Sequence, residues 1–264
     1  MTISIRPLHP VLGGEVDGID LRQPLSAADV AAIEAGMDKY AVLVFHGQDI
    51  TDDQQKDFSL NFGDLERPDS VSNITKDEDR RLGPDIADIS NLTKENKVYG
   101  GADRQRLFNL GNMLWHSDSS FRAVPAKYSL LSGRIIPATG GNTEFADMRA
   151  AYDALDDEMK ALIEDLVCEH SLLFSRGSLG FDELSAQEKA GFRPARQRLV
   201  RTHPVTGRKS LYLSAHAGTI LGWQTPEARI LLRELTEQAT QREFVYSHKW
   251  RQFDLVMWDN RQVM

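Results

Sequence analysis

The sequence is poor in cysteine, in long apolar runs and in positive charge. Its single cysteine, Cys168, cannot form a disulfide within the chain. No apolar stretch approaches the roughly 20 residues that cross a bilayer, and the opening "MTISIRPLHP" lacks the pattern of a secretory signal. Acidic residues outnumber basic ones, 39 to 31, whereas nucleic acid requires a basic surface. We therefore expect a cytoplasmic protein whose partners include neither a membrane nor a nucleic acid.

What is present is the composition of an ordinary globular protein. The 264 residues are 41% hydrophobic and 27% charged, and a chain of this length can bury the core of one large domain. No linker divides it. We expect a single domain over residues 1–264.

Hydrophobic patterns and capping residues predict the local structure. Strands are expected at 3–7, 41–45, 86–92, 127–137, 244–250 and 254–260, a strand after the Gly-Gly turn of "ATGGNTEF", and a hairpin over 198–214. Helices are expected at 25–40 with Ser26 as cap, at 52–63 between Thr51 and Gly63, at 148–155, at 156–171, and at 225–240 with Thr225 as cap.

These elements favour a fold that is mainly β with peripheral helices. The helices fall between strands without a regular strand-helix-strand rhythm, which disfavours a doubly wound parallel sheet. A double-stranded β-helix, or jelly-roll, core fits better. Residues 66–110 are polar and poorly periodic, and such a loop is equally an active-site cover or a plain solvated connection.

The stretch "NMLWHSDSSF" at 112–121 holds the strongest chemical signal. In an extended segment His116 and Asp118 project to the same side, while Ser117 projects to the other. Two histidines and one carboxylate make the facial triad that holds Fe(II) and leaves positions open for co-substrates. By itself the spacing is weak, because an aspartate beside a surface histidine produces the same pattern.

Ordered blocks along nearly the whole chain carry a family resemblance. They include "LWHSDSSF", "PATGGNTEFADMRAAYDAL", "LVRTHPVTGRK", "SAHAG", "LLRELTEQATQREFVYSHKW" and "DLVMWDNR". These blocks resemble the taurine dioxygenase superfamily and, within it, the 2,4-dichlorophenoxyacetate/2-oxoglutarate dioxygenases. The resemblance implies an enzyme that uses Fe(II), 2-oxoglutarate and O2.

The resemblance also implies roles for single residues. His116 and Asp118 would ligate Fe(II), Thr143 would hydrogen-bond a carboxylate of 2-oxoglutarate, and Trp258 would line that pocket. The substrate would be a small aromatic anion. The resemblance places five residues on its side of the site: His203, His216, Asn91, Lys97 and Ser119.

The family's third iron ligand is a histidine just past "MWDNR", followed by arginines that bind the two carboxylate substrates. In this register the histidine would follow Met264. We therefore expect that the sequence lacks the C-terminal end of the domain, including its last strand, the third ligand and the arginines.

For the activity, the resemblance implies hydroxylation of the carbon beside the ether oxygen of a phenoxyalkanoic acid, giving a phenol and glyoxylate. Other interpretations stay open: a taurine-type or other small-carboxylate dioxygenase, or a binding module without catalysis on the same barrel. A zinc hydrolase has no HExxH or second ligand cluster in its favour. A homo-oligomer is possible by analogy with relatives.

Overall fold

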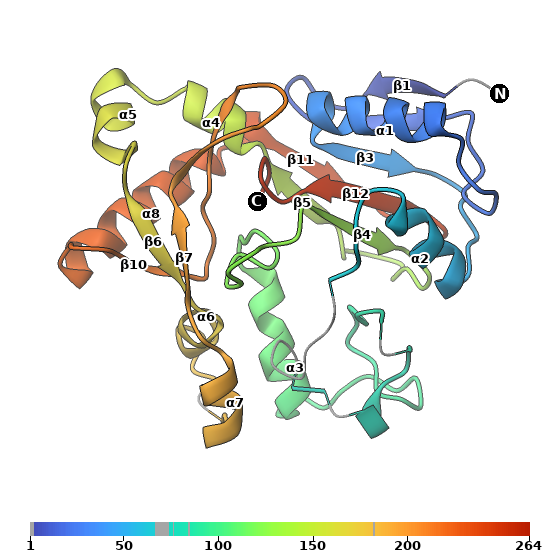
Figure 1. Cartoon of the computed structure of the whole chain (residues 1–264). Coiled ribbons are helices and arrows are strands. Elements are labelled where there is room, and N and C mark those ends of the chain that lie inside the picture. Colours follow the sequence, from blue (N-terminus) through green and yellow to red (C-terminus); the bar gives the residue numbers. More distant parts are fainter. Residues whose placement is uncertain (1–2, 67–73, 76, 84, 182) are drawn as a thin grey trace.

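A computed structural model describes residues 3–66, 74–75, 77–83, 85–181 and 183–264 (Figure 1). The strands are β1 Ser4–Pro7, β2 Gly14–Asp17, β3 Val42–Phe45, β4 Tyr128–Ser132, β5 Thr143–Ala146, β6 Val167–His170, β7 Ala195–Arg198, β8 Val200–Thr202, β9 Lys209–Leu211, β10 Ala217–Ile220, β11 Val245–His248 and β12 Leu255–Asp259. The helices are α1 Ala27–Tyr40, α2 Asp52–Leu60, α3 Arg104–Asn109, α4 Met148–Asp153, α5 Asp157–Ile163, α6 Leu172–Gly177, α7 Ala186–Gly191 and α8 Thr225–Ala239, with short 3-10 helices η1 Asp77–Asp79, η2 Leu110–Met113 and η3 Arg242–Phe244.

The largest sheet has the strand order β1-β2-β3-β12-β4. Only the β2–β3 pair in it is parallel. The central strand β3 is buried on both faces: Leu43 and Phe45 pack in the cluster under α1 and α2, whereas Val42 and Val44 pack toward Phe145 of β5. This double burial explains why "VLVF" is apolar throughout rather than alternating.

Three smaller sheets complete the described strands: β10-β6-β7, β11-β5 and β8-β9. Figure 1 shows α8 beside β6 and β10 on one side of the molecule, and α1 with β1 and β3 on the other. The described strands do not close into a barrel, and each is only three to five residues long. Among the described helices, none is both long enough and apolar enough to cross a membrane.

Capping chemistry sets two of the predicted helices. Ser26 and Thr51 each form a full capping box, in which the cap hydroxyl accepts from the third helical residue and the side chain of that residue accepts from the cap backbone. These two starts confirm the prediction. Helix α1 also lies close to β1 and β3 at Gly36, where an added Cβ would meet Ile5 at 2.4 Å.

Several predicted boundaries are wrong. Residues 86–92 form no strand, and only Leu92 makes an isolated bridge, to Val98. The predicted helix 156–171 ends at Ile163, and its tail becomes β6 because Val167–His170 pair with both β10 and β7. Tertiary pairing here overrides local helical pattern.

Smaller errors concern the ends of elements. Strand β4 occupies only five residues of the expected 127–137. Gln224, not Thr225, is the N-cap of α8. Helix α2 ends at Leu60, and Asn61 rather than Gly63 is its C-cap.

Candidate active site

His116 and Asp118 converge, as their spacing predicts. The Nε2 atom of His116 lies 3.2 Å from Oδ1 of Asp118, and the two side chains remain 24% and 35% exposed. Ser117 between them is buried and points away, where its hydroxyl donates to the carbonyl oxygens of Leu213 and Val263. The segment is a loop between η2 and β4 rather than a strand, yet it places both side chains on one side.

The orientation of the His116 ring is set by the backbone. Its Nδ1 lies 2.7 Å from the carbonyl oxygen of Leu114, so Nδ1 carries the hydrogen and Nε2 keeps its lone pair in the neutral ring. A hydrogen bond of this kind is how proteins hold a histidine ligand in the correct tautomer. Nε2 is therefore the nitrogen available to a metal.

The carboxylate of Asp118 is supported from β4. It accepts a hydrogen bond from Ser129, whose hydroxyl in turn accepts from Nδ2 of Asn260 at 2.8 Å. Burial raises the pKa of Asp118, but the hydrogen bond and charge of His116, with the bond from Ser129, outweigh it and lower the pKa. Burial lowers the pKa of His116, and Asp118 outweighs it in the same way and raises that pKa. Because ligand atoms must be deprotonated, a metal would replace the proton that the two groups share.

His216 lies next to the pair. Its ring is 6.0 Å from that of His116 at 72°, and 4.9 Å from the ring of Phe121. Ser175 donates its one hydroxyl hydrogen to Leu172, so it accepts from Nδ1 of His216. Burial, with the nearby charges of His116 and Arg176, holds the pKa of His216 well below its usual value. His216 is therefore neutral, with a free lone pair on Nε2.

Arg176 adds a buried positive charge near both histidines. Its guanidinium packs 4.7 Å from the centre of the Phe108 ring and donates to Oδ1 of Asn112, four residues before His116. Within the described part of the chain no carboxylate pairs with it, and burial lowers its pKa to about 10. The sequence does not indicate this role for Arg176, because nothing in "LLFSRG" distinguishes it from a surface arginine.

Trp258 on β12 and Thr143 on β5 belong to two different sheets, and of the two, a described contact, through Ser129, links Trp258 to the pair. Trp258 lies directly opposite Ser129 in the β12–β4 register, so the two side chains share a sheet face beside Asp118. The ring of Phe145 lies 5.4 Å from that of Trp258. Thr143 is two residues before Phe145 on β5, and alternation puts their side chains on one face.

The residues present supply one imidazole nitrogen and one carboxylate, which suit two positions of an Fe(II) triad. Among the residues that the structure describes, no group of three His, Cys, Asp or Glu side chains is arranged to hold a metal ion. The third ligand, expected after Met264, stays a prediction.

Comparison with known proteins assigns this geometry to a family. The taurine catabolism dioxygenase TauD, TfdA family matches residues 4–264. An alpha-ketoglutarate-dependent 2,4-dichlorophenoxyacetate dioxygenase of Cupriavidus pinatubonensis (strain JMP 134 / LMG 1197) is 46% identical over all of this chain and 91% of that protein. The chain belongs to the TauD, TfdA family of dioxygenases.

Two further members widen the comparison. An (S)-phenoxypropionate/alpha-ketoglutarate-dioxygenase of Sphingobium herbicidovorans is 38% identical over 98% of this chain and 86% of that protein. The crystal structure of AAD-2 in complex with Mn(II) and N-oxalylglycine has a TM-score of 0.97 and 62% identity, covering 100% of this chain and 91% of that one. The chain therefore has the fold of TauD-type dioxygenases.

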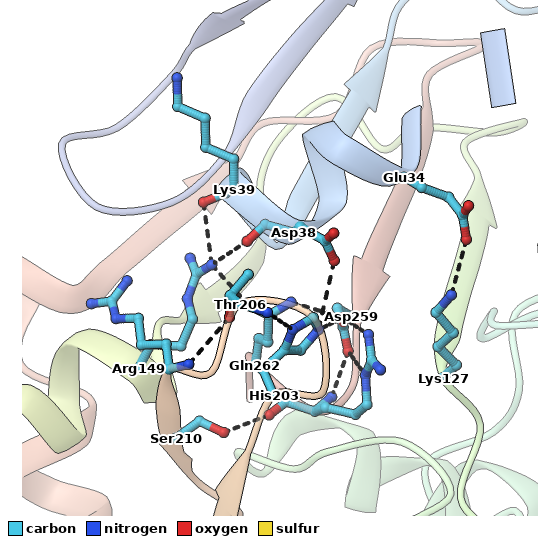
Figure 2. A network of polar contacts seen from close by, with 12 residues as sticks. Glu34, Asp38, Lys39, Lys127, Arg149, His203, Thr206, Ser210, Asp259 and Gln262 are labelled. Atoms are coloured by element: carbon cyan, nitrogen blue, oxygen red, sulfur yellow. Dashed lines mark hydrogen bonds and ion pairs between the residues drawn. The ribbon is translucent and has the colours of Figure 1, made fainter. Parts of the chain in front are cut away.

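His203, which the family resemblance places on the substrate side, has contacts of a different kind in the structure. It is buried, Nδ1 accepts from the backbone N–H of Thr206 at 3.2 Å, and Nε2 lies 3.6 Å from Asp259 and 3.7 Å from Asp38 (Figure 2). None of these contacts involves His116 or Asp118, so the described contacts do not bring His203 together with the pair.

The three remaining predicted substrate residues, Ser119, Asn91 and Lys97, are partly or fully exposed. Ser119 follows Asp118 directly in a left-handed conformation, with φ of 56°, and its hydroxyl donates to Glu66 at 2.6 Å. Asn91 and Lys97 are exposed on the 86–98 loop, where the carbonyl of Asn91 accepts from the backbone N–H of Tyr99 and that of Lys97 from Thr93. Only Ser119 is joined to the pair by the chain itself.

Proposed function

We propose that this protein is an Fe(II)- and 2-oxoglutarate-dependent dioxygenase that hydroxylates the carbon beside the ether oxygen of phenoxyalkanoic acids. The observation that carries the proposal is the convergence of His116 Nε2 and Asp118 Oδ1 at 3.2 Å on a partly exposed side of the chain. We also propose that the sheets form a double-stranded β-helix core and that the protein acts in the cytoplasm. The names of the relatives support the substrate class.

His116 and Asp118 would hold the metal. Bound Fe(II), with 2-oxoglutarate and O2 as co-substrates, would supply the oxidising power that converts a C–H bond to C–OH while 2-oxoglutarate becomes succinate and CO2. The product carbon then bears both a hydroxyl and an aryl ether oxygen; as the bond from this carbon to the ether oxygen breaks and the hydroxyl proton is lost, a phenol leaves and a phenoxyacetate yields glyoxylate. The protein's task is to bind, orient and neutralise charge.

The surrounding residues suit those tasks. Thr143 and Trp258 would bind 2-oxoglutarate from the sheet face beside Asp118. Neutral His216, with Phe121 against its ring, offers an aromatic surface and one acceptor nitrogen to an aryl group. Ser119, Asn91 and Lys97 would face the substrate's polar end. His203 keeps its predicted place on the substrate side, although its contacts also support a role in holding Asp259.

Product analysis tests the proposal. The enzyme is supplied with Fe(II), 2-oxoglutarate and, in separate reactions, 2,4-dichlorophenoxyacetate, 2-phenoxypropionate, taurine or no substrate. We expect succinate and a phenol in equal amounts from the phenoxy acids and little succinate from taurine. Succinate formed only with taurine would assign the enzyme to the sulfonate reaction. No substrate-dependent succinate in any reaction would favour a binding module.

A further inference from the structure

The indole of Trp250 donates a hydrogen bond to the hydroxyl of Thr143. The Nε1 and Oγ1 atoms are 3.0 Å apart, although the residues are 107 positions apart in the chain. Indole nitrogen is a donor only, so the hydroxyl oxygen of Thr143 must accept, and its own hydrogen remains free to donate. A carboxylate accepts hydrogen bonds and donates none when ionised.

We propose that Trp250 is a positioning residue that aims the hydroxyl hydrogen of Thr143 at a carboxylate of 2-oxoglutarate. This inference rests on the proposed function, in which Thr143 binds that co-substrate. Without the indole N–H, the Thr143 hydroxyl could turn its hydrogen toward another acceptor. With it, the donor direction is set before 2-oxoglutarate arrives, which reduces the cost of ordering on binding.

The indole is held in place on two sides. Its ring stands edge-on to the ring of His248, with centres 4.7 Å apart at 86°. On another side it lies so close to Gly133 that an added Cβ there would meet Cε3 of the indole at 2.8 Å. His248 itself lies opposite Thr143 in the β11–β5 register. Trp250 therefore has little freedom to rotate away from Thr143.

A buried polar cluster fixes His248 in turn. Nε2 of His248 lies 3.1 Å from Oδ2 of Asp254, and its Nδ1 lies 3.2 Å from the hydroxyl of Tyr246. Asp254 is fully buried, and its other oxygen lies 2.5 Å from Nδ1 of His46. The backbone N–H of Arg251, next to Trp250, also donates to Asp254. The cluster thus holds both the histidine under the indole and the backbone beside it.

The first test removes only the N–H group. Trp250→Phe keeps an aromatic ring against His248, and Trp223→Phe is the matched control, because Trp223 packs against a different core cluster. Calorimetric titration of the anaerobic, metal-loaded enzyme with 2-oxoglutarate gives Kd, and steady-state assays give KM and kcat. For Trp250→Phe we expect both Kd and KM for the co-substrate to rise about fivefold, with a small effect on kcat and on the KM for the phenoxy acid. Trp223→Phe should bind as the unmodified protein does.

A double-mutant cycle separates positioning from packing. Thr143→Val removes the hydroxyl while it keeps the shape, and Thr143→Ser keeps a hydroxyl on a smaller side chain. If Trp250 acts through the hydroxyl, Trp250→Phe weakens 2-oxoglutarate binding in the unmodified protein and in the Thr143→Ser variant. It adds no further loss to Thr143→Val. Thermal unfolding of every variant checks that the fold is intact.

The outcomes distinguish the inference from the function on which it rests. An equal loss from Trp250→Phe with and without the hydroxyl would overturn the positioning role and leave Thr143 as a co-substrate residue. Unchanged binding in Trp250→Phe would do the same. Unchanged binding in Thr143→Val would overturn both roles. Product analysis with the unmodified enzyme decides the dioxygenase function independently of all these variants.

Discussion

Two histidine–aspartate pairs in this protein use the same chemical groups in opposite settings. At His116 and Asp118 the imidazole bonds backbone through Nδ1, and the carboxylate has a neutral serine as its further hydrogen-bond donor. At His203 and Asp259 the carboxylate is fully buried and accepts from the backbone N–H and two guanidinium nitrogens of Arg261 and from Gln262. Figure 2 shows His203 between Asp38 and Asp259 within this network.

The difference between the two pairs lies in which atoms remain free. The negative charge of Asp259 is neutralised by Arg261, whose guanidinium lies 2.5 Å away. Asp259 therefore stabilises the fold and is not available to bind a metal cation. Among the residues that the structure describes, the ion-pair partner of Asp118 is His116, a residue type that itself ligates metals. For these two pairs, the arginine beside Asp259 marks a structural role, and its absence beside Asp118 leaves that carboxylate a candidate metal ligand.

The largest effect should come from Asp118→Asn. An amide oxygen carries no charge, so we expect Mn(II) affinity to fall by more than about 100-fold, beyond the 10- to 100-fold typical of groups that merely support a ligand. Succinate formation should disappear with it. Mn(II) binding is followed by electron paramagnetic resonance, with Asp165→Asn as the control carboxylate, because Asp165 is 90% exposed. Retention of full affinity in Asp118→Asn would remove the contrast between the pairs.

Asp259→Asn should affect stability instead. It leaves the guanidinium of Arg261 and the buried His203 without their anion, and breaking a buried pair in this way costs about 3 kcal/mol. Urea unfolding measures the free energy, and metal affinity should change little. Asp165→Asn is the control, because Asp165 is 90% exposed in its pair with Arg198 and should cost less than about 0.5 kcal/mol. Equal stability of the two variants would contradict the structural role.

The acid dependence of stability gives a third comparison. Burial raises the pKa of Asp259, but its hydrogen bonds to Arg261, the nearby His203 and the charge of Arg261 outweigh it and lower the pKa to about 2 from 3.8. A depressed carboxylate pKa contributes stability that is complete above the unfolded value and is lost as pH falls through the folded value. We expect a loss of about 2 kcal/mol between about pH 4 and pH 2. Asp259→Asn should lack this part of the acid slope in urea melts at several pH values, and an unchanged slope would assign it to other groups.

The features that could be predicted are those made by residues close together in the sequence. Ser26 and Thr51 cap their helices, "VLVF" is a buried strand, and His116 and Asp118 converge across one residue. These contacts are local, so the residues near each position in the sequence predict them, although the spacing of His116 and Asp118 does not by itself indicate a metal.

Features made by distant residues were not predictable. Val167–His170 has a helical pattern but pairs with two strands, and Asp254 meets His46 across 208 positions. The indole bond to Thr143 spans 107 positions. "YSHKW" contains an aromatic and a histidine at strand spacing, which indicates a core strand and says nothing about which hydroxyl the indole reaches.

Lys97→Ala should give the smallest effect, a change in the KM for the phenoxy acid. It extends the comparison from buried charged pairs to an exposed charge. Lys97 is exposed on the 86–98 loop, where one charge contributes at most about 1 kcal/mol to binding an anion in water. We expect the KM for the phenoxy acid to rise about threefold at low salt and the difference to shrink at high salt, because exposed charges are screened. Unfolding free energy and 2-oxoglutarate affinity should stay unchanged.

Lys94→Ala is the matched control, since Nζ of Lys94 donates to the backbone of Glu78. Equal effects of the two lysines would mean that the loop acts only through its overall charge, whereas an effect confined to Lys97 would place its ammonium group at the substrate's carboxylate.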